Sequence, residues 1–217
     1  MAELISSADN CHAFPLFLYQ EAMLEGLRGT PNLASSELGE TDPERALAYV
    51  YAVLYSPTYR RRYQGRLRTD LPRIPNCEDG ELRSRLVDLG RELVALHLLE
   101  LPRVAKPIRT YLGPKSPQVE RVGWSDDTVW LDARGALRDR AGSVGFQGVP
   151  EAVWNFKVGS YQVCEKWLKD RTGQTLSKEE ITRFERIVVA TSETLRVMTE
   201  IDEVIEERGG WPSAFRR

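Results

Sequence analysis

Six arginines lie in the fifteen residues from Tyr59 to Arg73, where Asp70 is the only acidic residue. Guanidinium groups bind phosphate oxygens through paired hydrogen bonds, so this cluster could hold the backbone of a nucleic acid. Successive residues of a helix are rotated by about 100°, and about two of three consecutive arginines could therefore face one strand. The candidate phosphate contacts are Arg60, Arg61, Arg62 and Arg66. The alternative is a solvated helix end whose arginines pair with nearby acids.

A second group of candidate residues surrounds Gly159, in the stretch FKVGSYQVCEKWLKDRTG. Glycine between a strand and a helix lets the backbone approach a ligand closely, and the first amides of a helix can bind a phosphate. We therefore predict that a helix follows Gly159 and that a positive rim surrounds its beginning; the alternative is a structural turn. Gln147, near a glycine-flanked strand end, could read adenine through two hydrogen bonds. The candidate nucleic-acid contacts around Gly159 are Lys157, Ser160, Tyr161, Lys166, Lys169 and Arg171.

Catalytic chemistry has few candidates in this chain. Asp126, Asp127 and Asp132 cluster and could suggest a metal-dependent nuclease, but no lysine follows at a useful spacing, and Ser-Asp-Asp-Thr is typical of a hairpin turn. The sequence has no GxxxxGK[ST], GxGxxG, GxSxG or HExxH motif. Its two histidines, His12 and His97, make a zinc site hard to build. We expect no catalysis, no metal and no cofactor in this chain.

The composition indicates a globular protein with segregated charge. Of 217 residues, 41% are hydrophobic and 29% charged, and the net charge is −2. These values argue against disorder and against a uniformly basic nucleic-acid binder, but positive charge can still be concentrated locally. No apolar run is long enough to cross a membrane, and the N-terminus does not resemble a signal peptide. Three widely spaced cysteines (Cys11, Cys77 and Cys164) without a CxxC pair favour a reducing compartment, so we expect a cytoplasmic protein.

Helix signals dominate residues 41–105. Thr41–Glu44 has the proline and glutamate of a helix start, and Ser56–Pro57 should end that helix. The next residues, LPRIPN, predict an extended connector, after which Asp79 can cap a second helix that Pro102 stops. Leucines recur along this second helix at spacings of four and three, the pattern of lengthwise packing on another helix. They are Leu82, Leu86, Leu89, Leu93 and Leu96.

Residues 106–159 have the composition of a small sheet. VERVGW, DTVWLDA, SVGFQGV and EAVWNFKV are short, rich in valine and aromatic residues, and separated by turn residues, so we predict antiparallel strands. Helical periodicity returns at Tyr161. Ser177–Glu180 has the spacing of a capping box and predicts the start of the longest helix, which Gly209–Gly210 should end.

The predicted fold class is α+β, with a small antiparallel sheet and long packed helices, that is, a helical spacer plus a recognition subdomain. We expect one integrated domain in four segments. They are an irregular N-terminal segment (1–40), a helical part with the arginine-rich element (41–105), a small β-sheet part (106–159) and a second helical part (160–217).

Several phrases in the chain occur together in a known family. They are FPLFLY, PNL, YVYAVLYSPTYRRRY, LPRIP, LGRELVALHLL, VWNFKVGSYQVCEKWLKDRTGQTLS and ERIVVATSETLRVMTEID, in that order. Together they resemble the C-terminal specificity domain of type ISP restriction–modification enzymes and related adenine-specific DNA methyltransferases, over nearly the whole chain from Phe14. Where that family usually has Gly-Gly-Tyr, this chain has Gly159-Ser160-Tyr161.

The resemblance implies a target-recognition domain, or a detached fragment of one, that binds double-stranded DNA beside a methyltransferase or nuclease subunit. The [N/D]PP[Y/F] motif and the S-adenosylmethionine glycine loop of the methyltransferase module are absent, so we expect S-adenosylmethionine only on an associated methyltransferase domain. An alternative is a protein-interaction module that docks a methyltransferase or nuclease partner without reading DNA itself. An orphan nuclease using the aspartate cluster is a third hypothesis.

Overall fold

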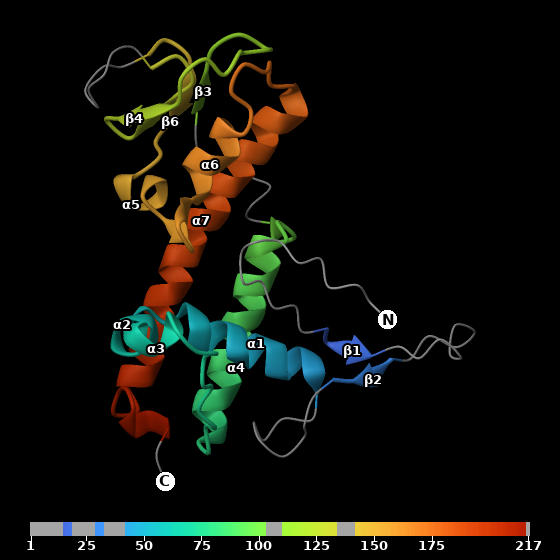
Figure 1. The fold of residues 1–217 in the computed structure, drawn as a ribbon, viewed down its shortest axis with the longest axis vertical. Helices are drawn as coiled ribbons and strands as arrows, with labels where there is room; N and C mark the ends of the chain where they lie inside the picture. The colour runs from blue at the N-terminus through green and yellow to red at the C-terminus, as the bar shows by residue number, and fades with distance from the viewer. Residues whose placement is uncertain (1–14, 19–28, 33–41, 103–109, 134–141, 216–217) are drawn as a thin grey trace. The chain divides into compact units, whose positions relative to one another are not determined.

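The computed structural model describes residues 15–18, 29–32, 42–102, 110–133 and 142–215 (Figure 1). The chain divides into two compact units, residues 1–91 with 204–217 (unit 1) and residues 92–203 (unit 2). Both boundaries fall inside helices, because α4 (Gly80–His97) and α7 (Lys178–Glu206) each contribute to both units. The units therefore cut across the four predicted segments. The predicted α+β class is confirmed.

The first described elements of unit 1 are a short antiparallel pair, β1 (Phe17–Leu18) and β2 (Thr30–Pro31), so the segment predicted to be irregular contains two strands. Helix α1 (Pro43–Tyr55) starts where it was predicted, with the Asp42 carboxylate accepting a hydrogen bond from the Glu44 amide at 3.0 Å. The predicted break at Ser56–Pro57 is also confirmed. Ser56 follows the last residue of α1 and caps α2 (Pro57–Arg62), which leads into α3 (Gln64–Leu67).

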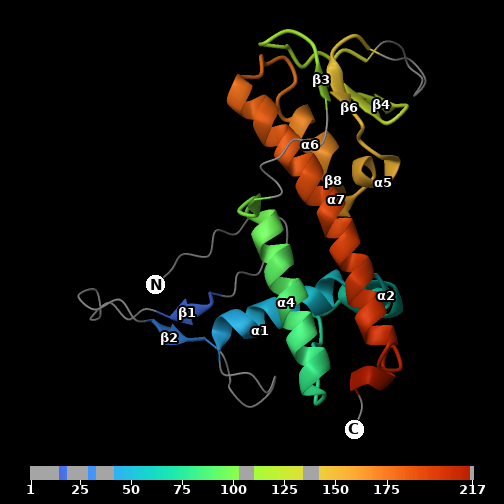
Figure 2. The ribbon, with the colours of Figure 1, turned by 180° about the vertical axis from the view of Figure 1, so that it is seen from behind.

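Helix α4 begins with the predicted cap, since the Asp79 carboxylate accepts hydrogen bonds from the amides of Glu81 and Leu82. All five leucines of the predicted seam are buried. Helix α1 crosses α4 in unit 1 (Figure 2), and Gly90 makes the close approach possible. A Cβ atom at Gly90 would lie 1.8 Å from the backbone oxygen of Ala48.

The end of α4, in unit 2, differs from the prediction. The helix ends at His97 rather than at Pro102, because Leu99 adopts a left-handed conformation with φ of 58°. The amides of Leu99 and Glu100 then bond the carbonyls of Leu96 and Ala95, which satisfies the last carbonyls of the helix. A leucine at this position gives no sequence signal, since glycine is the usual residue there.

The main sheet of unit 2 has the order β3-β6-β5-β4 and is antiparallel throughout. Its strands are β3 (Thr110–Leu112), β4 (Gly123–Ser125), β5 (Thr128–Trp130) and β6 (Gly145–Gln147). Asp126 and Asp127 form the predicted hairpin turn, both with positive φ. The prediction of a strand over EAVWNFKV is wrong in its first half, which forms helix α5 (Glu151–Trp154). Strand β3 was not predicted.

The core of unit 2 lies between this sheet and the helices α6 (Val163–Lys169) and α7, which run beside each other in Figure 1. Phe146 from β6 meets Phe184 from α7 with ring centroids 4.5 Å apart. Cys164 and Leu168 of α6 are fully buried in the same cluster. The predicted capping box is confirmed at the start of α7, where the amides and side chains of Ser177 and Glu180 bond each other reciprocally.

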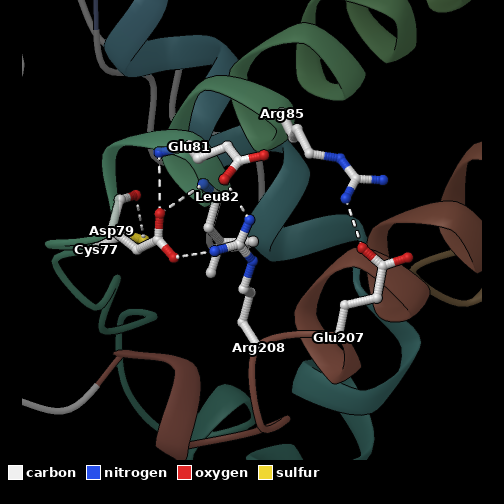
Figure 3. Close-up of polar contacts among 7 residues, drawn as sticks. All are labelled: Cys77, Asp79, Glu81, Leu82, Arg85, Glu207 and Arg208. Carbon is white, nitrogen blue, oxygen red and sulfur yellow. Dashed lines mark hydrogen bonds and ion pairs between the residues drawn. The ribbon is translucent and has the colours of Figure 1, made fainter.

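Side chains of α4 and of the end of α7 also meet within unit 1 (Figure 3). Arg208, just after α7, donates to the carboxylates of Asp79 and Glu81 at 2.9 and 2.5 Å. Arg85 donates to Glu207 at 2.5 Å. Two arginines here face three carboxylates, so they compensate only part of the negative charge of this cluster. A 3₁₀ turn covers Ser213–Phe215.

Candidate nucleic-acid interface

The arginine-rich element of unit 1 is held in place by buried aromatic rings. Tyr59 of α2 is 2% exposed, and its ring contacts Tyr63 at 4.9 Å and Trp211 at 5.2 Å. The Ser56 hydroxyl accepts hydrogen bonds from the Tyr59 amide and the Trp211 indole. The Tyr59 hydroxyl in turn donates to the carbonyl of Arg73 in the extended connector. Because α2 is anchored on its tyrosine face, its arginines are presented away from that core.

The four predicted arginines differ in their contacts. Arg60 is half-buried and donates from Nε to the Leu54 carbonyl at 2.6 Å. Its guanidinium carbon lies 4.7 Å from the centroid of the Tyr55 ring. Both contacts attach Arg60 to the last turn of α1. Arg61 is exposed and donates to the Thr58 hydroxyl at 3.0 Å. Arg62 and Arg66 are exposed too.

None of these four arginines has an acidic partner within the described residues. The alternative, in which acids neutralise the helix end, therefore receives no support from the described part of the chain.

Two further arginines extend this element. Arg68 and Arg73 are exposed, and both were visible in the sequence as part of the cluster, although they were not chosen as candidates. Arg66 and Arg73 line a hollow of about 230 Å³ together with Tyr63, Leu71 and Trp211. Leu71 is 56% exposed. The arginine-rich element thus presents exposed arginines beside an apolar hollow.

The second predicted group does not have the predicted backbone. Gly159 and Ser160 form the turn of a two-stranded hairpin, β7 (Lys157–Val158) and β8 (Tyr161–Gln162), with φ of +60° at the glycine. The prediction that a helix directly follows Gly159 is wrong, because α6 begins only at Val163, whose amide bonds the Phe156 carbonyl. Lys157, Ser160 and Tyr161 are exposed on this hairpin, and Tyr161 is 57% exposed.

The three basic residues beyond the hairpin each have a carboxylate partner. Lys166 pairs with Asp170, the C-cap of α6, and Lys169 lies 3.0 Å from Glu165; both pairs are four residues apart. Arg171 lies 3.0 Å from Glu180 and stacks on the ring of Trp167 at 3.6 Å. Their positive charge is therefore largely compensated, and Lys157 is the remaining cation of the predicted rim without an ion pair among the described residues.

The aspartate cluster has structural roles. Asp126 and Asp127 form the β4–β5 turn. The Asp132 carboxylate accepts hydrogen bonds from the Ser143 amide and hydroxyl and from the Val144 amide, at 2.6–3.0 Å. Partial burial alone would raise the pKa of Asp132, but these hydrogen bonds lower it below the ordinary value.

The described residues contain no group of three or more histidine, cysteine or acidic side chains that could hold a metal ion. Nor does the described part of the chain contain a helix both long and apolar enough to cross a membrane. Gln147, the predicted adenine reader, is exposed on β6 and lies between Thr110 and Thr128 of the neighbouring strands.

Comparison with known proteins gives one family and several related folds. The sequence model of the type ISP C-terminal specificity domain matches residues 2–200. No curated protein matches the chain.

Three solved structures are similar in fold. A nuclease-deletion mutant of the type ISP restriction–modification enzyme LlaGI, in complex with a DNA substrate mimic, has a TM-score of 0.52 and 22% identity. The ATP-dependent type ISP restriction–modification enzyme LlaBIII bound to DNA has a TM-score of 0.55 and 19% identity. The DrdV–DNA complex has a TM-score of 0.59 and 22% identity. They are matched over 75, 76 and 86% of this chain, but it spans only 14, 11 and 21% of theirs.

Proposed function

Because the chain belongs to the type ISP C-terminal specificity domain family, we propose that it recognises a double-stranded DNA target for a restriction–modification enzyme and performs no chemical step itself. The observation that carries this proposal is the family match over residues 2–200. The three solved structures with a similar fold are complexes with DNA or a DNA mimic, which supports the same proposal. Methylation of adenine, cleavage and S-adenosylmethionine binding would belong to an associated methyltransferase or nuclease. We also propose a cytoplasmic location, where the free thiols of Cys77 and Cys164 would stay reduced.

The arginine element of unit 1 would supply the phosphate contacts. Phosphate contacts position a protein on the duplex and make its affinity depend on salt. Arg61, Arg62 and Arg66 suit this role because they are exposed and have no acidic partner among the described residues. Arg60 contributes less, since its Nε already bonds the Leu54 carbonyl. On the hairpin of unit 2, Lys157 would be the main phosphate contact.

The salt dependence of duplex binding tests this role. The logarithm of the binding constant falls with the logarithm of salt concentration at a slope of about −0.9 for each neutralised phosphate. Replacing Arg61, Arg62 and Arg66 with alanine should therefore reduce the slope by about 2.7 if all three contact phosphates. The wild-type chain would then lose about 40-fold more affinity than the variant between about 50 and 200 mM salt.

A matched triple variant provides the control. Lys166, Lys169 and Arg171 are also basic, but each has a carboxylate partner. Replacing these three with alanine should change the slope much less than the arginine variant does. Equal effects of the two variants would contradict the assignment of the phosphate contacts. Absence of duplex binding by the wild-type chain at about 50 mM salt would contradict the proposed function itself.

A second candidate function is docking of a methyltransferase or nuclease partner. The apolar hollow beside the arginines favours it, because Leu71 and Trp211 present carbon surface there and Leu71 is largely exposed. Tight association with such a subunit, without duplex binding, would favour this function. Leu71→Asp should then abolish the association and leave the fold intact.

A further inference from the structure

The segment before β4 in unit 2 is fixed from both sides. On one side, the Val119 amide bonds the Gln174 carbonyl at 2.9 Å, and the Leu176 amide bonds the Pro117 carbonyl at 2.8 Å. The Val119 side chain is fully buried in the core of unit 2. On this stretch, buried and exposed side chains alternate from Pro117 to Glu120, as in a strand with one face on a core. Gln118 and Glu120 are the exposed members.

The alternation fails at a β-bulge on the other side of the segment. The amides of Glu120 and Arg121 both donate to the carbonyl of Leu131, at 2.9 and 2.8 Å, so two residues lie opposite one. In a regular strand the side chain after Glu120 would turn back to the core. Instead Arg121 is exposed like Glu120, and the alternation resumes with Val122 packed against the core. The bulge therefore places two consecutive polar side chains on the same outer surface.

These side chains border a polar hollow of about 540 Å³. Asp132 also lines this hollow, and its carboxylate accepts hydrogen bonds from the Ser143 amide and hydroxyl and from the Val144 amide. Glu120 and Arg121 form no ion pair within the described residues. Gln118 uses one amide hydrogen in a 3.3 Å bond to the Gly173 carbonyl. Its second amide hydrogen and its oxygen have no partner among the described residues.

We propose that Gln118, Glu120 and Arg121 read base edges in the major groove; this inference rests on the proposed DNA-recognition function. Arginine pairs with guanine O6 and N7, glutamine with adenine N6 and N7, and glutamate accepts from cytosine N4. The three side chains thus offer the donor and acceptor patterns for three different bases. Their charges, one positive and one negative, nearly cancel, which suits base contacts and not phosphate binding, because a carboxylate repels phosphates.

Selection of bound fragments from a random pool of duplexes tests the inference. We expect the wild-type chain to enrich a sequence motif, and Arg121→Ala to lose preference at one base pair while the other positions persist. Discrimination at that pair should fall roughly 5- to 150-fold, the value of a paired contact to one base. Arg62→Ala is the matched control, since it should weaken all sequences alike and leave the motif unchanged.

Two further variants and a folding measurement complete the test. Glu120→Gln and Gln118→Ala should each change preference at a different base pair from Arg121→Ala, and circular dichroism should show all three variants folded, because the side chains are exposed. An unchanged motif in all three would overturn the inference and leave the proposed function standing. Arg121→Ala would also overturn it by weakening every sequence equally with a smaller salt slope, since that result identifies a phosphate contact. A wild-type chain that binds no duplex would overturn both proposals.

Discussion

Replacing Gly90 with alanine tests how closely α1 and α4 approach each other in unit 1. In an isolated helix this substitution is favourable by about 1 kcal/mol, because glycine loses more backbone freedom than alanine. In this protein the added Cβ would lie 1.8 Å from the Ala48 oxygen and 2.5 Å from the Ala48 carbonyl carbon. Both atoms belong to the backbone of α1, so no side-chain rotation can relieve the clash.

The magnitude follows from the size of this clash. Ordinary van der Waals contact for a Cβ begins at 3.4 Å, so the shortfall is 3.4 − 1.8 = 1.6 Å. The helices would have to separate, which would expose the fully buried Ala52 and the nearly buried Tyr49 on α1. Overpacking typically costs about 1–3 kcal/mol, and a backbone clash belongs at the upper end. After subtracting the gain in helix propensity, about 1 kcal/mol, we expect a net loss of about 2 kcal/mol.

Urea unfolding followed by circular dichroism at 222 nm measures this change in the free energy of unfolding. Gly80→Ala is the matched control in the same helix, because no atom lies within 4 Å of a Cβ at Gly80. We expect the control to change stability by less than about 0.5 kcal/mol. A Gly90→Ala variant that is as stable as the wild type, or more stable, would refute the close approach of α1 and α4.

Three further predictions concern buried or bonded polar groups. Ser56→Ala should lower the free energy of unfolding by about 2–3 kcal/mol. It removes the cap of α2 and leaves the buried Trp211 indole without its acceptor. A loss below about 0.5 kcal/mol in urea titration would contradict this prediction. Hydrogen bonds hold the pKa of Asp132 below its ordinary value, so its contribution to stability is present above about pH 4 and is lost as the pH falls through the folded-state pKa. Asp132→Asn should therefore lower stability at neutral pH and flatten its decline in acid, and an unchanged acid profile would disprove the role. Burial raises the pKa of Cys164 to about 12, so iodoacetamide should modify this thiol in urea but not in the native chain, as peptide mass spectrometry can check.

Local signals in the sequence predicted much of the fold. The cap at Asp79, the box at Ser177–Glu180 and the turn at Asp126–Asp127 each depend on residues within four positions of one another, and all three are confirmed. EAVWNFKV was misread because a short apolar run fits a strand and one turn of helix equally well. The hairpin at Gly159 was missed because strands of two residues are decided by their pairing and not by their composition.

The candidate site was less predictable than the fold. The partners of Lys166 and Lys169 lie four residues away on the same helix, and this spacing was readable. The Arg171–Glu180 pair joins the turn after α6 to α7, and the β-bulge at Arg121 depends on the Leu131 carbonyl of a facing segment. Contacts of this kind exist only once the chain has folded, so neither residue type nor spacing indicates them.

The bulge before β4 has a consequence for engineering. Val119 and Val122 on either side of it belong to the core, whereas the intervening positions contribute their side chains only to solvent. A library randomised at 120 and 121 would therefore sample new surface chemistry with little cost in folding. Sorting such a library against a chosen duplex would be a direct route to a domain with altered targeting.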